Sequence, residues 1–251
     1  MHHTRRNSRL LLAILLIVAT AGCGEDEKEP PTPLRLFVGY DCSISADENN
    51  VPQLNPAILD SLIAIVARRG GSVNFLPFTS NSNQPVMRLQ LTWFADKTLQ
   101  ERATLAELQR AHIRNFKALV QSSVGMETGT SSQLLQQLQT KGEEGRRAER
   151  TDIWGAIRRF NMVLQEPYIG PPTQDVGLMI TDGIDDAKLF PRCELQTQHI
   201  FTVGMESKKA VEVFGTRTLA FESLASVLAI LQNLPEHVES YPQPATMDYS
   251  S

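Results

Sequence analysis

The amino-acid sequence predicts an α/β domain with a doubly wound, mostly parallel sheet and one antiparallel edge strand. Short, almost wholly apolar runs alternate along the chain with amphipathic stretches of helical period, and one further run alternates apolar with polar residues. The chain of 251 residues, 41% hydrophobic and 21% charged, is long enough to bury one sizeable core. Collagen, coiled-coil and disulfide-rich miniprotein classes are therefore excluded.

The elements of the first half follow from apolar pattern and turn residues. Buried strands are expected over residues 34–40 and 72–78, because both runs are short, apolar and nearly free of charge. The helix between them, over 54–69, has an apolar stripe and is closed by Gly70-Gly71. Residues 86–94 alternate in polarity, which predicts the half-buried antiparallel edge strand.

A helical insertion is expected over about residues 98–150. Its first part, 98–121, carries apolar residues at helical spacing, and Ser131 or Ser132 could cap a shorter helix before a charged, exposed loop at 141–150. Regular alternation of strands and helices then resumes. The later elements are a helix at 152–165, strands at 176–180, 199–203 and 218–221, a short helix capped by Ser207 and ended by Gly215, and a last helix at 223–233.

Polar motifs stand where two of the buried strands end. The strand at 34–40 runs directly into a D-x-S-x-S sequence, and the strand at 176–180 runs into T-D-G. A third candidate, Thr151, stands in a polar loop at the start of the helix at 152–165. Parallel sheets covered on both faces bind ligands at the carboxyl ends of their strands. The three segments are therefore expected to meet at that edge of the sheet.

Together the three segments resemble the metal-ion-dependent adhesion site of the von Willebrand factor A (integrin I-like) family. The match extends over about residues 34–234. The resemblance implies a complete site for Mg²⁺ or Mn²⁺, and a protein ligand whose Asp or Glu completes the coordination of the metal. It also implies a protein-binding module that is not an enzyme. The five implied site residues are Asp41, Ser43, Ser45, Thr151 and Asp182.

The residue types suit a small, hard cation. Mg²⁺ prefers about six oxygen ligands, and the hydroxyls of the two serines and Thr151 are neutral oxygens that could bind it directly. Asp41 and Asp182 would then act mainly through coordinated water. Singly, each residue also has an ordinary explanation: the serines and Thr151 as cap or turn hydroxyls, and Asp182 as a turn former before Gly183. Nearby acids are assigned to capping and surface roles: Asp152, Asp185 and Asp186.

One feature departs from the family pattern. Asp41 and Thr151 are 110 residues apart, which is more than compact members have between these elements. The insertion at about 98–150 enters the loop that holds Thr151, called here the second metal loop, so it is expected to lie near the ligand face. As a hypothesis, it shapes or covers the partner site.

Two other functions stay open. A metal-dependent hydrolase would have to take its base from Asp182 or Asp186, because the sequence has no G-x-S-x-G elbow, no phosphate-binding Gly-rich loop with Lys and no H-E-x-x-H. The other alternative is a structural envelope scaffold whose metal site is vacant.

Residues 1–22 are predicted to be an export signal. Leu10–Ala21 are twelve successive apolar or small residues behind three arginines, which is too short a run to span a bilayer. The run ends in Ala21-Gly22-Cys23, which resembles the bacterial lipobox. The resemblance implies a lipidated Cys23 in the bacterial cell envelope, at the outer membrane if the cell has two membranes, with the domain in the periplasm or outside. The alternative is an ordinary signal peptide with a chance cysteine.

Residues 23–33 are acidic and then proline-rich, which predicts a tether ahead of a domain at 34–234 and a polar tail at 235–251. Because residues 1–22 hold three Arg and no acid, the remainder carries 21 basic and 28 acidic residues, a balance of −7. That charge argues against a nucleic-acid partner.

Cys42 and Cys193 are the cysteines left after Cys23. In an oxidising compartment they could form a disulfide, or they could remain two buried thiols. The sequence does not decide between these alternatives, since it cannot give the distance between their Cα atoms.

Overall fold

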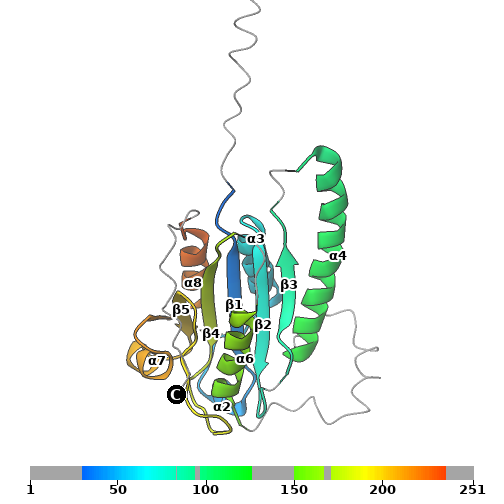
Figure 1. Ribbon diagram of the computed structural model, residues 1–251. Coiled ribbons are helices and arrows are strands. Elements are labelled where there is room, and N and C mark those ends of the chain that lie inside the picture. The colour runs from blue at the N-terminus through cyan, green and yellow to red at the C-terminus, as the bar shows by residue number, and fades with distance from the viewer. Residues whose placement is uncertain (1–29, 83, 94–96, 126–149, 167–170, 236–251) are drawn as a thin grey trace, which may run out of the picture. The chain divides into compact units, whose positions relative to one another are not determined.

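The computed structural model describes residues 30–82, 84–93, 97–125, 150–166 and 171–235. Strands and helices are interspersed along this part of the chain, with β2 followed directly by β3 and β4 by β5 among the described elements (Figure 1). The strands are β1 (Leu34–Asp41), β2 (Gly71–Phe78), β3 (Met87–Leu91), β4 (Gln174–Ile180), β5 (His199–Val203) and β6 (Thr218–Phe221). The helices are α2 (Ile44–Glu48), α3 (Pro56–Ala67), α4 (Leu99–Ser123), α6 (Ile153–Gln165), α7 (Ser207–Phe214) and α8 (Leu224–Gln232).

The six described strands form one sheet in the order β3-β2-β1-β4-β5-β6. Four of its five strand pairs are parallel, and β3 runs antiparallel to β2 at one edge. The predicted fold class, a mostly parallel α/β sheet with one antiparallel edge strand, is confirmed. The parallel strands all end at the same edge, so the segments after β1 and β4 emerge as neighbours.

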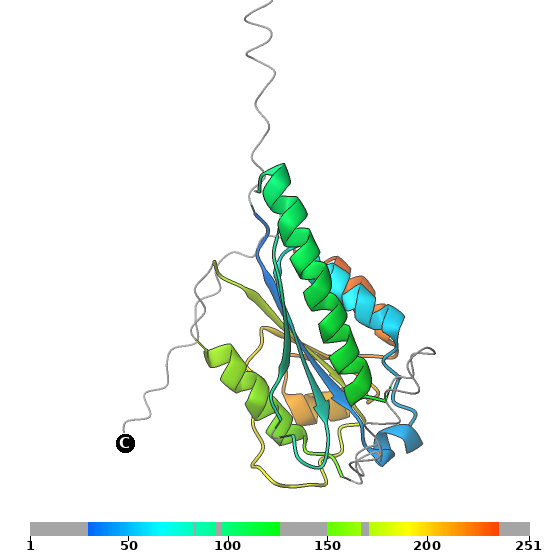
Figure 2. The same ribbon diagram turned by 90° about the vertical axis from the view of Figure 1, so that its right-hand side faces the viewer.

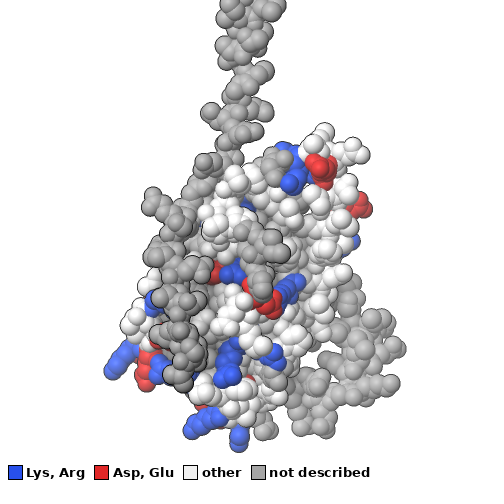
Figure 3. Space-filling model, in the orientation of Figure 1, with Lys and Arg blue, Asp and Glu red and all other residues white. Residues whose placement is uncertain are grey.

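Two apolar layers cover the two faces of the sheet. Leu36 and Val38 of β1 point into one layer, together with side chains of α3, α4 and α8. Phe37, from the same strand, points into the other layer with Phe160 of α6, because successive strand side chains face opposite ways. Figure 2 shows α3 and α4 on one side of the sheet and α6 on the other. On the side seen in Figure 3, the visible Lys and Arg side chains are separate and form no continuous basic area.

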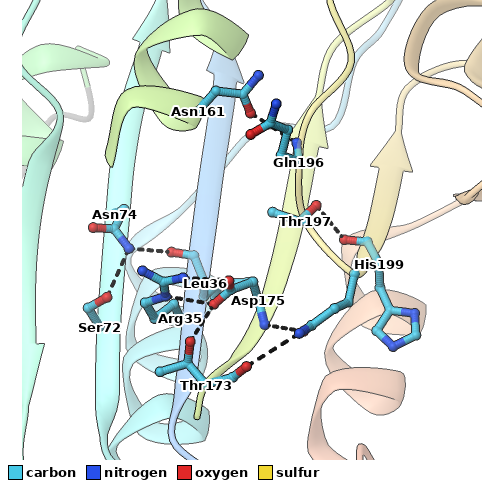
Figure 4. A network of polar contacts seen from close by, with 11 residues as sticks. Arg35, Leu36, Ser72, Asn74, Asn161, Thr173, Asp175, Gln196, Thr197 and His199 are labelled. Atoms are coloured by element: carbon cyan, nitrogen blue, oxygen red, sulfur yellow. Dashed lines mark hydrogen bonds and ion pairs between the residues drawn. The ribbon is translucent and has the colours of Figure 1, made fainter. Parts of the chain in front are cut away.

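The α6 face turns polar toward the beginnings of the parallel strands (Figure 4). Arg35 of β1 forms a bidentate ion pair with Asp175 of β4, with Nε 2.6 Å from Oδ1 and Nη2 2.5 Å from Oδ2. Asn74 of β2, which is 2% exposed, donates to Ser72 Oγ at 2.9 Å. This network lies at the opposite end of the strands from the D-x-S-x-S and T-D-G motifs, so it joins strands and does not belong to the candidate site.

Most predicted elements are present, with small shifts of boundary. The long helix α4 begins at Leu99, one residue after the predicted start, and its cap Thr98 forms a reciprocal capping box with Glu101. One local prediction was wrong and one helix was missed. Ser207 is the first residue of α7 and not its cap, because Glu206 holds the cap position without a side-chain hydrogen bond. The short helix α2 was not predicted, since five residues are too few to show a helical period.

Several predictions fall on residues outside the described ranges. These are the export signal at 1–22, lipidation of Cys23 with most of the tether, the helix after Ser131 or Ser132, nearly all of the loop at 141–150, and the tail. Within the described residues, none of the helices combines the length and the apolar character that crossing a membrane requires.

Candidate metal centre

The end of β1 supplies the first three candidate ligands. Asp41 is the last residue of β1, and its Oδ1 accepts the backbone N–H of Ser43 at 2.9 Å. That bond turns the chain sharply and places the Ser43 and Ser45 hydroxyl oxygens 3.0 Å apart. Ser43 also caps α2 by accepting the Ala46 N–H at 3.2 Å. A short helix therefore fixes the D-x-S-x-S segment at the carboxyl end of the central strand.

Asp182 follows β4, the strand that pairs with β1. Its Oδ1 accepts the N–H of Ile184 at 2.9 Å, in a turn that Gly183 makes possible with a φ of 74°. Its Oδ2 accepts the side-chain amide of Asn49, which follows α2, at 2.9 Å. Thr181 ties the two strand ends together, because its hydroxyl donates to Asp41 Oδ2 at 2.6 Å.

Thr151 reaches the same place from the start of α6. Its side chain is fully buried, and its hydroxyl donates to Asp41 Oδ1 at 3.4 Å. The structure thus brings the residues predicted from three separate segments into one hydrogen-bonded group, with Asp41 at its centre. The D-x-S-x-S segment and Asp182 are linked in turn through Asn49.

Asp152 anchors the Thr151 segment to the rest of the domain. This fully buried side chain caps α6 by accepting the Gly155 N–H at 2.9 Å, and its second oxygen accepts the Ser82 N–H at 3.0 Å. A Cβ at position 155 would lie 2.1 Å from that second oxygen, so only glycine leaves room for the carboxylate. Asp152 therefore joins the segment after β2 to the second metal loop.

Two carboxyl groups are buried here, and no Lys or Arg of the described residues forms an ion pair with them. Asp41 is 3% exposed and Asp182 is 4% exposed. Burial raises the pKa of Asp41 above its ordinary value, hydrogen bonds from Ser43 and Thr181 oppose the rise, and the charge of Asp182 adds to it. Buried charges in proteins are normally paired or bound to a metal ion. The position accordingly favours a cation.

The oxygens present fit Mg²⁺. Neighbouring ligands of an octahedral Mg²⁺ ion, each at ~2.1 Å from it, lie about 3.0 Å apart, and this is the separation of the Ser43 and Ser45 oxygens. The carboxylate oxygens of Asp41 and Asp182 already accept protein hydrogen bonds. The hydroxyls of Ser43, Ser45 and Thr151 are the groups that the resemblance implies for direct coordination. In the described part of the chain no three His, Cys, Asp or Glu residues group as metal ligands, so a site here depends on hydroxyls.

Some of the site residues also have the cap and turn roles that their types allow, and these roles do not exclude a metal site. Ser43 is a helix cap and Asp182 forms a turn, as their types allow. The cap of α6, however, is Asp152 and not Thr151. A hydroxyl or carboxylate oxygen has more than one lone pair, so an oxygen that accepts one backbone N–H can still face a cation.

Cys42 and Cys193 are thiols in the structure, and no disulfide joins them. Their Sγ atoms lie near different carbonyl oxygens, since Cys42 Sγ is 3.8 Å from Tyr40 O and Cys193 Sγ is 3.8 Å from Trp154 O. Burial raises the pKa of the Cys193 thiol, and the nearby Arg158 opposes that rise.

Sequence reasoning did not identify three residues that support the site: Asn49, Thr181 and Asp186. Asn49 stands one helical turn after Ser45, but nothing in the sequence connects it with Asp182. Thr181 could have been identified from the sequence, because it is the first residue of the T-D-G motif. Asp186, assigned a capping and surface role, accepts the N–H of Thr151 at 2.5 Å.

No family model matches the sequence, and the comparison with curated proteins gives no significant match. Among solved structures, the chain is similar to proximal thread matrix protein 1 from the mussel byssus, with 12% identity, 81% of this chain and 47% of that one covered, and a TM-score of 0.40. It is also similar to a von Willebrand factor type A protein from Catenulispora acidiphila, with 12% identity and a TM-score of 0.40. That match covers 80% of this chain and 41% of the other. The chain thus spans less than half the length of each of these structures.

Proposed function

We propose that this protein is a von Willebrand factor A-like module that binds a partner protein through a divalent cation. The observation that carries the proposal is the pair of buried carboxylates, Asp41 and Asp182, which lie among hydroxyl oxygens and form no ion pair with Lys or Arg of the described residues. A bound Mg²⁺ or Mn²⁺ would supply the missing positive charge and an open coordination position for an Asp or Glu of the partner. The activity is binding and not catalysis.

The hydroxyl and carboxylate groups of the site would have different roles. The hydroxyls of Ser43, Ser45 and Thr151 would face the cation directly, and the carboxylates of Asp41 and Asp182 would hold its water molecules. Because the protein would then supply only neutral oxygens to the first coordination shell, the cation would remain attractive to a partner carboxylate. Ile44, which lies between the two serines and is 42% exposed, offers an apolar contact beside that position.

Anchoring to the cell envelope through a lipid on Cys23 is a further part of the proposal. Its support comes from the sequence of residues 1–33. Leu34 starts β1 and Asp41 ends it, so the domain receives the tether at one end of the sheet and carries the candidate site at the other. At ~3.3 Å per residue, this places the site roughly 25 Å farther along the strand.

Capture of a partner from envelope extracts tests the binding function. Wild-type protein in Mg²⁺ is expected to retain one or more proteins that are absent in EDTA and absent with Asp41→Ala, because both changes remove the cation. Mass spectrometry of the retained proteins identifies the partner. The control is Asp60→Ala, an exposed carboxylate of α3, which should capture as the wild type does. Undiminished capture in EDTA would refute metal-dependent binding.

A further inference from the structure

We propose that Asp186 is a positioning residue that holds Thr151 in the metal centre, an inference that rests on the proposed function. Thr151 follows the insertion, and its side chain has only a long, 3.4 Å hydrogen bond to Asp41. Its backbone is held much more tightly. Asp186 Oδ1 accepts the Thr151 N–H at 2.5 Å, and the Ala187 N–H donates to the Thr151 carbonyl at 3.1 Å. Both backbone polar groups of Thr151 are thus taken by two adjacent residues of another loop.

This contact is not the capping of a helix. The helix α6 begins at Ile153 and has Asp152 as its cap, so Thr151 lies outside it. The neighbouring Asp185 does serve the helix, because its Oδ1 accepts the Ile153 N–H at 2.7 Å. Asp186 acts instead on the one residue of this segment whose hydroxyl faces Asp41. A hydrogen bond from an N–H to an ionised carboxylate is among the stronger ones in proteins, which suits a role in fixing a backbone.

The same loop carries Asp182 directly. Residues 181–187 therefore place two of the candidate metal groups, Asp182 through their own backbone and Thr151 through Asp186 and Ala187. Without Asp186, the Thr151 hydroxyl would lose its fixed position beside Asp41. Outer contacts of this kind typically change metal affinity about 10- to 100-fold when they are removed.

Titration calorimetry with Mg²⁺ tests the proposal on full-length variants. Asp186→Ala is expected to weaken Mg²⁺ binding about 10- to 100-fold, whereas Asp186→Asn, which keeps an acceptor oxygen, should stay within about threefold of the wild type. Asp185→Ala is the matched control from the same loop, and it should lower the melting temperature but leave Mg²⁺ affinity within about threefold. If Asp186→Asn loses as much affinity as Asp186→Ala, the effect comes from charge and the positioning role is wrong.

A double-mutant cycle shows whether Asp186 acts through Thr151. The double variant Asp186→Ala/Thr151→Ala should bind Mg²⁺ no more weakly than Thr151→Ala alone, while additive losses would contradict the proposal. Amide hydrogen exchange gives a readout that needs no metal. The Thr151 amide should be protected in the wild type and in Asp185→Ala, and exposed to exchange in Asp186→Ala. If the wild type binds no Mg²⁺, the proposed function fails, and amide exchange still decides whether Asp186 holds Thr151.

Discussion

Replacing Asp41 by Asn is expected to abolish Mg²⁺ binding and, at the same time, to stabilise the metal-free protein. Asp41 accepts hydrogen bonds from Ser43, Thr151 and Thr181, so it is the centre of the site. Its burial beside Asp182 makes the ionised form costly, which is why its pKa is raised. In EDTA, Asp41→Asn should melt ~2–4 °C above the wild type, the shift that ~1 kcal/mol produces in a domain of this size.

The pH dependence of this difference follows from the direction of the pKa shift. A carboxyl group whose pKa is higher in the folded state than in the unfolded state binds protons more tightly when folded. Its cost to stability is therefore absent below the ordinary pKa of Asp, grows as the pH rises through the raised pKa, and is complete above it. The melting difference between Asp41→Asn and wild type in EDTA should shrink as the pH is lowered through this range. A wild type that is the more stable of the two at neutral pH in EDTA would contradict this account.

Replacing Asp152 by Ala is expected to lower the free energy of unfolding by about 3 kcal/mol, the largest stability effect at this end of the sheet. The change removes the cap of α6 and leaves the buried N–H groups of Ser82 and Gly155 without their acceptor, and each such loss costs about 1–2 kcal/mol. The melting temperature should fall by roughly 6–12 °C. Differential scanning calorimetry in EDTA measures the change apart from any metal effect.

Asp60→Ala is the control for this prediction. Asp60 is a half-exposed carboxylate of α3 paired with Lys117, and such surface pairs contribute less than about 1 kcal/mol. Equal melting temperatures for the Asp152 and Asp60 variants would mean that Asp152 does not anchor the second metal loop.

The course of the chain could be predicted from the sequence because the strands are short apolar or alternating runs and most helices have an apolar period. The strand at 34–40, for instance, is nearly all apolar and ends at a charged residue, and the structure places β1 at Leu34–Asp41. The candidate site could be predicted for a related reason. The D-x-S-x-S and T-D-G motifs directly follow two buried strands, and a parallel sheet brings the carboxyl ends of such strands together.

The supporting contacts could not be predicted in the same way. The bonds from Asn49 to Asp182 and from Thr151 to Asp186 join residues 133 and 35 positions apart. They depend on how loops pack after the sheet has formed, and a loop has no period from which its geometry could be inferred. The helix α2 is too short to show one. Such residues become visible only when their hydrogen bonds are known.

An anomalous difference map from crystals of the full chain grown with Mn²⁺ tests the central claim most directly. We expect one strong peak within bonding distance of the Ser43, Ser45 and Thr151 hydroxyl oxygens, with water molecules between the metal and the carboxylates of Asp41 and Asp182. The peak should vanish in crystals of Asp41→Asn. A map with no peak among these five residues, or with a peak that persists in Asp41→Asn, would contradict the account.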